Sequence, residues 1–237
     1  MKIELLRVYI QNILLEGGAP DSSGVAAIQD NSSENTVVIL FRYDILYKEL
    51  NKSRTVDLSI FLANALQKCV VAFGSFGMPE EGKAFGSWQV YNAAGEGYGK
   101  ILYGMGYALS PSGLLMPDRL SVSPKAADAW YKASQDKKRK AYKLDNLPPN
   151  NKTKTTVDDS VLLNKPDKEY LDYAYGEAGW EESMTKKILR LGDAAIEEVV
   201  SMSNGNLNHD MVKNIIIEIG KEVFIQNIHH QGDYIDF

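Results

Sequence analysis

Three alternating glycines, Gly95, Gly97 and Gly99, stand directly before a segment whose apolar residues have helical spacing. Glycine has no Cβ atom, so a turn rich in glycine lets backbone N–H groups approach an anion closely. The N-terminus of the helix that follows adds a partial charge of roughly +0.5. The spacing of these residues therefore predicts a phosphate-binding turn.

Two common phosphate-binding motifs match this turn only in part. A P-loop ends in Gly-Lys-Ser/Thr, whereas Gly99 and Lys100 are followed by Ile101, which has no hydroxyl for a magnesium ion. A dinucleotide-binding fold requires Gly-x-Gly-x-x-Gly and an acidic residue about 20 positions later. The glycines of this chain alternate instead, which favours a third interpretation.

The run from Gly95 to Tyr103 resembles the pyrophosphate-binding turn of the GCN5-related N-acetyltransferase (GNAT) superfamily. A second segment, from Ser123 to Trp130, is similar to the family's next element. There a small polar residue, an alanine three positions later and an aromatic residue four beyond that open the helix that flanks the cofactor. The resemblance covers about residues 36 to 135. The string from Gly113 to Trp130, with Leu144–Asn146 and Asp158–Asp159 downstream, also looks like uncharacterised acetyltransferase-like proteins of tailed bacteriophages.

The resemblance implies that acetyl-CoA or another acyl-CoA is the cosubstrate, that an amine acceptor attacks the bound thioester directly, and that no metal ion takes part. It implies that backbone groups around Val90 hold the acyl carbonyl and that amides of the glycine turn hold the pyrophosphate. The cofactor-binding residues expected on this basis are Gln89, Val90, Tyr91, Gly95, Gly97, Tyr98, Gly99, Lys100, Ser123 and Trp130.

Several positions depart from the family pattern and bear on catalysis. Ala94 replaces a basic or polar residue, and Ser123 replaces an asparagine. Trp130 stands where catalytic members carry a tyrosine that protonates the departing thiolate, and an indole cannot serve as that acid. Tyr131 and Glu96 remain as the candidate catalytic acid and base. Two hypotheses stay open: an N-acyltransferase, or a catalytically silent structural or assembly protein such as a virion component.

Other residue types offer little chemistry. The only cysteine, Cys69, lies in an apolar run, which excludes an intramolecular disulfide. The three histidines, His209, His229 and His230, lack the spacing of metal ligands. The net charge of −5 gives no overall electrostatic attraction to nucleic acid or to a membrane. The basic run Lys137–Lys140 is interpreted as a solvated helix end, and a coenzyme 3′-phosphate, a nucleic-acid backbone or an acidic partner stays open as its ligand.

The elements that position the glycine turn follow from apolar periodicity. We expect an α/β fold with a GNAT-like central mixed β-sheet flanked by helices and a helical C-terminal extension. The expected units are an N-terminal amphipathic helix (1–17), an α/β domain (18–147), and a linker plus helical extension (148–237). Strands are expected at 36–41, 69–73, 88–91 and 113–116, and helices at 56–66, 100–109, 124–134, 182–202 and 208–228.

The remaining expectations concern partners and location. The terminal helices are candidates for self-association or for docking on a protein partner. The aromatic cluster of Tyr170, Tyr173, Tyr175 and Trp180 is expected to dock on the α/β domain or to form a subunit contact. No apolar run approaches the roughly 18 residues of a membrane helix, and the first residues lack a signal-peptide pattern. We therefore expect a cytoplasmic protein, or a virion component if phage-encoded.

Overall fold

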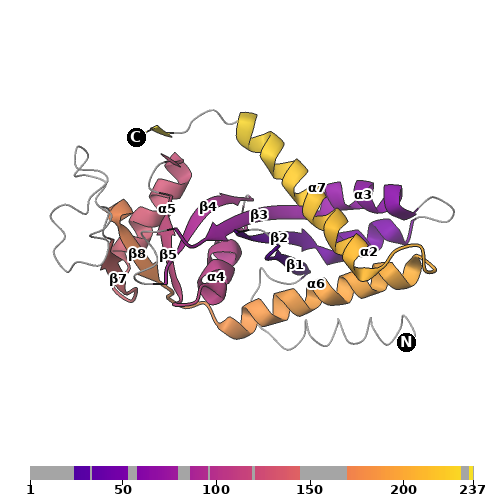
Figure 1. Cartoon of the computed structure of the whole chain (residues 1–237), viewed down its shortest axis with the longest axis horizontal. Coiled ribbons are helices and arrows are strands. Elements are labelled where there is room, and N and C mark those ends of the chain that lie inside the picture. The colour runs from indigo at the N-terminus through magenta and orange to yellow at the C-terminus, as the bar shows by residue number, and fades with distance from the viewer. Residues whose placement is uncertain are drawn as a thin grey trace.

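Figure 1 shows the computed structural model of the chain, which describes residues 24–32, 34–52, 58–79, 86–95, 97–118, 121–144, 170–230 and 235–236. The expected N-terminal helix at residues 1–17 lies outside the described residues, and so does Glu96. Within the described ranges, no helix is both long and apolar enough to cross a membrane.

The described residues form a seven-stranded mixed sheet in the order β1-β2-β3-β4-β5-β8-β7. β4 and β5 are parallel, and every other neighbouring pair is antiparallel. This arrangement confirms the expected α/β class with a mixed sheet. The strands are β1 (Val25–Asp30), β2 (Thr36–Arg42), β3 (Val70–Gly77), β4 (Trp88–Ala94), β5 (Leu114–Pro117), β7 (Ala141–Lys143) and β8 (Tyr173–Gly176), with β6 (Ser121–Val122) and β9 (Ile235–Asp236) paired separately.

Helices cover both faces of the sheet, as expected. Figure 1 shows α3 and α7 on one side of β1–β3 and α4 on the other. Alternate residues of β2 explain this arrangement: Ile39 packs in one apolar cluster, and Val38 and Leu40 pack in the other. The helices are α2 (Tyr43–Leu50), α3 (Leu58–Cys69), α4 (Gly99–Leu109), α5 (Pro124–Gln135), α6 (Glu182–Met202) and α7 (His209–His230).

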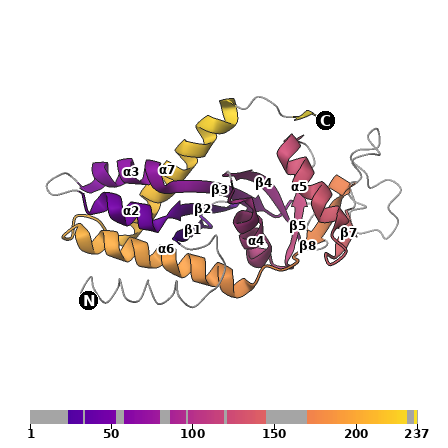
Figure 2. The same ribbon diagram turned by 180° about the vertical axis from the view of Figure 1, so that it is seen from behind.

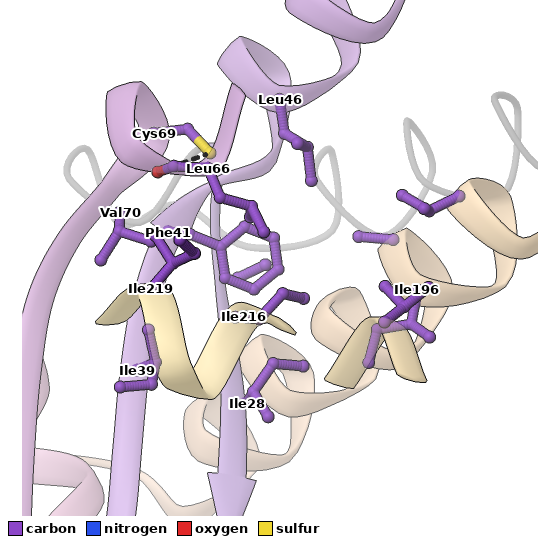
Figure 3. Packing of buried hydrophobic residues seen from close by; sticks show 14 of the residues in the cluster. Ile28, Ile39, Phe41, Leu46, Leu66, Cys69, Val70, Ile196, Ile216 and Ile219 are labelled. Atoms are coloured by element: carbon purple, nitrogen blue, oxygen red, sulfur yellow. Dashed lines mark hydrogen bonds between the residues drawn. The ribbon is translucent and has the colours of Figure 1, made fainter. Parts of the chain in front are cut away.

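The C-terminal helical hairpin belongs to the core of this α/β unit. Figure 3 shows Ile196 of α6 and Ile216 of α7 beside Ile28 and Phe41 of the sheet. α6 runs along the edge strand β1 (Figure 2), where it covers a strand edge that would otherwise be open to pairing. α6 and α7 are therefore integral to the fold rather than appended to it.

The expected boundary at residues 147/148 lies outside the described residues, and β8, which follows it in the chain, joins the central sheet. β8 comes from the segment that was expected to be a linker and helical extension, yet it pairs with β5 and β7 in the central sheet. Tyr175 of β8 is 1% exposed, and its hydroxyl donates a hydrogen bond to the carbonyl oxygen of Tyr170. Trp180 packs on α4 at Gly104 and donates its indole N–H to Thr185 Oγ1 at 2.9 Å. The aromatic segment thus docks within its own chain.

Candidate functional site

The glycine turn joins the end of β4 to the start of α4. The Tyr98 amide donates to the carbonyl oxygen of Gly95 at 3.2 Å, and the Tyr98 carbonyl oxygen accepts the amides of Ile101 and Leu102 at 3.0 Å. Tyr98 is the N-cap residue, its side chain makes no capping bond, and the first turn of α4 holds no acidic residue. Among the described residues, no side chain accepts a hydrogen bond from the first amides of α4, and the dipole of the helix favours an anion there.

The three glycines are required for different reasons. Gly95 has φ +138°, and a Cβ atom there would lie 2.4 Å from the Cβ of Ala72 on β3. Gly95 is thus explained by packing within the chain. Around Gly97, with φ +80°, and around Gly99, no described atom lies within 4 Å of a Cβ position. The open space that a phosphate group needs is at Gly97 and Gly99 alone.

β4 presents an uncovered edge just before this turn. Its parallel register with β5 runs from Trp88 to Val90, whereas β4 itself continues to Ala94. Val90 pairs with Phe76 of β3 and Asn92 pairs with Ser75, which leaves Tyr91 as the extra residue of a β-bulge. Bulges bend and twist a strand and are frequent next to binding sites. On the β5 side, no described strand covers the segment Asn92–Ala94.

The residues expected to hold the acyl carbonyl lie just before that edge. Gln89 and Val90 are buried, and each pairs with β3 on one side and with β5 on the other. Their backbone groups are therefore engaged within the sheet. The edge that an extended ligand could pair with begins after the bulge residue Tyr91, at Asn92, and continues to Ala94.

The start of α5 is held by internal contacts. The side-chain oxygen of Ser123 accepts a hydrogen bond from the Ala126 amide at 3.3 Å, so this serine is the helix N-cap. Trp130, further along α5, is 2% exposed. Its ring stacks on Tyr175 at 5.8 Å and meets Tyr103 edge-on at 5.5 Å. The structure places Trp130 in the core, with almost no surface for a cofactor.

Of the two catalytic candidates, only Tyr131 lies among the described residues. Tyr131 is 50% exposed, and its ring contacts Tyr170 edge-on at 5.5 Å. Glu96 lies outside the described residues. Lys100, in the first turn of α4, is exposed. The described part of the turn therefore offers an anion-binding backbone and a nearby cation but no positioned acid–base pair.

Sequence reasoning missed a second cation beside the turn. Arg42, at the end of β2, donates two hydrogen bonds to Asp44 at 2.8 and 2.7 Å. These bonds, together with a further bond to Tyr98 of the turn, raise the pKa of Arg42 above its ordinary value. No local motif links Arg42 to Tyr98, because β3, β4 and two helices separate them in the chain. The one available signal was an arginine at the end of a buried strand.

No protein-family model, curated protein or solved structure matches this chain. The resemblance to acetyltransferases therefore stays an expectation from the sequence. Among the described residues, no group of three or more histidine, cysteine, aspartate or glutamate side chains gathers as metal ligands would. His209 Nδ1 lies 3.9 Å from Oδ1 of its exposed neighbour Asp210, and the side chains of His229 and His230 lie outside the described set.

Proposed function

We propose that the chain binds an acyl-coenzyme A at the glycine turn and transfers the acyl group to an amine. The observation that carries this proposal is the edge of β4 at Asn92–Ala94, which no described strand covers and which leads directly into the turn where no described atom lies within 4 Å of a Cβ position at Gly97 or Gly99. An acyl-CoA has a chain of amide groups followed by a pyrophosphate. The two features of the site stand in the same order along the backbone as these two parts of the ligand.

The chemistry of each feature supports this assignment. Amides of the ligand would pair with the backbone groups of β4 at Asn92–Ala94, with which no described strand pairs on the β5 side, as an added strand does. The pyrophosphate would accept hydrogen bonds from the turn amides, where the dipole of α4 favours negative charge. Arg42, held beside Tyr98, forms an ion pair with Asp44 at 2.7 Å, so it adds hydrogen-bond donors at the same end of the sheet rather than an unpaired positive charge.

Acyl transfer at this site would need little covalent chemistry from the protein. The amine nitrogen attacks the thioester carbonyl carbon, the C–N bond forms, and the C–S bond breaks. The amine proton passes to a base, and the departing coenzyme thiolate takes up a proton from solvent or from an acid. Backbone N–H groups along β4 would stabilise the negative charge that develops on the carbonyl oxygen. Positioning and electrostatics would supply most of the rate.

A second candidate function is supported by the burial of Trp130. The residue at the expected acid position is an indole in the core, and Tyr131 contacts Tyr170 instead of the turn. A chain with this arrangement could hold a coenzyme without transferring its acyl group. It would then act as a silent structural or assembly component, with self-association or a protein partner engaging its helices.

Calorimetric titration with acetyl-CoA tests the binding site, and the backbone conformations of Gly97 and Gly99 show which of them is suitable for substitution. A side chain at Gly97 would strain the backbone, since its φ is +80°. Gly99 is helical with open space around it, so Gly99→Leu should fold normally while filling the anion cradle. We expect Gly99→Leu to weaken acetyl-CoA binding at least about tenfold, a loss of about 1.4 kcal/mol. Gly99→Ala, the matched control, should bind more tightly than Gly99→Leu.

The refuting results are equally definite. Unchanged affinity in a folded Gly99→Leu protein would show that the turn is not the site. Absence of binding by the unmodified chain at millimolar acetyl-CoA would refute the acyltransferase and leave the structural or assembly protein. If acetyl-CoA binds, an assay for release of its free thiol in the presence of lysine-containing peptides, polyamines or amino sugars separates the two candidate functions. Turnover with any of these amines supports the enzyme, and binding without thiol release supports the silent protein.

A further inference from the structure

β5, β8 and β7 form one side of the sheet (Figures 1 and 2). An open depression of about 510 Å³ is lined by residues of these strands and of the loops beside them. Gly113 and Leu114, at the start of β5, form part of its wall. The glycine turn follows the end of β4, and β4 and β5 run parallel. The depression is therefore at the opposite end of the sheet from the proposed coenzyme site and requires a separate explanation.

The basic run beside this depression divides into residues with different tasks. The Arg139 side chain is mostly buried, and it donates a hydrogen bond to the carbonyl oxygen of Gly176 at 2.9 Å. Its guanidinium lies 5.2 Å from the centre of the Tyr107 ring and pairs with Asp136 at 3.5 Å. Arg139 thus fastens the loop between α5 and β7 onto the sheet. Its positive charge is used within the chain.

Lys138 and Lys140, on either side of Arg139, line the depression. The Lys138 amide donates to Asp136 Oδ1 at 3.0 Å, and the Lys140 carbonyl oxygen accepts the Gly176 amide at 2.8 Å. The backbone that carries both lysines is thus held at two points. Neither ammonium group forms an ion pair with any residue that the structure describes. Two available positive charges therefore converge on one hollow.

The single carboxylate of the wall does not cancel these charges. Glu177 Oε1 accepts the Trp180 amide at 2.8 Å, and Glu177 Oε2 lies 4.0 Å from Arg139. Both oxygens are thus directed to groups within the chain. The depression keeps a net positive character, and a volume of this size is typical of sites for small molecules, which span about 300–1,000 Å³.

We propose that this depression binds a small phosphate monoester that carries a planar ring, the chemistry of a nucleoside monophosphate. Lys138 and Lys140 would hold the phosphate through charge-assisted hydrogen bonds. Tyr142, 38% exposed on the same wall, offers a ring face for stacking. Ser112, whose hydroxyl donates to the carbonyl oxygen of Gly86 at 2.8 Å, keeps its oxygen as an acceptor for a ligand hydroxyl.

Calorimetry of the full chain at low salt, with uridine monophosphate, inorganic phosphate and uridine as probes, tests this site. We expect the monophosphate to bind, phosphate alone to bind more weakly, and uridine not to bind. Lys138→Gln/Lys140→Gln should weaken monophosphate binding by about 10- to 100-fold, because two charge-assisted bonds are lost. Lys48→Gln/Lys213→Gln removes the same charge from α2 and α7, far from β7 and β8 (Figure 1), and should change the affinity less than about twofold.

Amide chemical shifts of the unsubstituted chain locate the ligand independently of any variant. Uridine monophosphate should shift the amides of Gly113 and Gly176, and Gly99→Leu should bind it unchanged, which separates this site from the coenzyme site. The proposal would be overturned if the monophosphate did not bind at 10 mM, a concentration at which even a very weak ligand binds, or if uridine bound equally well. It would also be overturned if both double-lysine variants lost the same affinity, or if the amide shifts were confined to Gly97 and Gly99.

Discussion

Replacement of Gly192 by alanine is expected to lower the free energy of unfolding by about 2 kcal/mol. A Cβ atom at this position of α6 would stand 1.9 Å from the carbonyl oxygen of Ala27 on β1 and 2.8 Å from its carbonyl carbon. Real Cβ contacts essentially never fall below 3.0 Å, and backbone atoms cannot turn aside. α6 would therefore have to move away from β1 by roughly 1 Å, which disturbs close packing along the whole helix.

The magnitude follows from two opposing terms. Overpacking of a well-packed interior costs about 1–3 kcal/mol and sometimes more, and a clash with backbone belongs at the upper end. Alanine in place of glycine within a helix gains about 1 kcal/mol. The net loss near 2 kcal/mol corresponds to a melting temperature about 4–8 °C lower in a chain of this size.

Urea unfolding followed by circular dichroism measures this change, and Gly99→Ala is the matched control. Gly99 undergoes the same substitution at the start of α4, with no described atom within 4 Å of its Cβ position, so its stability should stay equal or rise. A Gly192→Ala protein as stable as the unsubstituted chain would show that α6 does not lie tightly against β1. Unfolding in two separate steps would likewise contradict a shared core.

Three further predictions concern single residues. Trp130→Ala should lower the free energy of unfolding by about 3–5 kcal/mol, as measured in urea, because Trp130 is core and not a coenzyme contact. Cys69, which is 0% exposed and whose thiol pKa is raised by burial to about 12, should stay unreactive toward a disulfide reagent until the chain unfolds. Burial also raises the pKa of Tyr103 from 10.0 to about 12. Between these values the unfolded chain binds fewer protons, so stability falls as pH rises, and Tyr103→Phe should reduce that fall in alkaline urea titrations.

The sequence predicts those elements whose signal is local. Thr36–Arg42 is apolar along nearly its whole length, which indicates a strand covered on both faces, and both clusters of the core meet on it. α6 was expected at residues 182–202, the bounds the structure shows, because its apolar residues repeat with helical spacing over 21 residues. α2 was missed. It follows β2 directly, and its N-cap residue Arg42 makes no side-chain capping bond that would mark a helix start.

Elements created by distant pairing could not be predicted in this way. β8 is four residues long and is a strand only because β5 and β7 flank it in space. Its aromatic residues indicated docking but not a place in the central sheet. Trp130 shows the same limit at the site, since its burial depends on Tyr175 of β8 and on Tyr103 of α4. Sequence spacing located Trp130 on α5 but did not reveal which side of the helix faces the core.

The three glycines of the turn, equivalent in the sequence motif, have different environments in the structure. Alternating spacing made Gly95, Gly97 and Gly99 equivalent, yet contact with Ala72 explains Gly95 without any ligand. Only Gly97 and Gly99 leave space that the described chain does not fill. The argument for a coenzyme therefore depends on these two residues together with the uncovered edge of β4. Of the three glycines, Gly99 alone combines open space with helical backbone, so a substitution there changes ligand access without straining the turn. Its effect on acetyl-CoA binding therefore distinguishes a turn that only packs within the chain from a turn that binds a ligand.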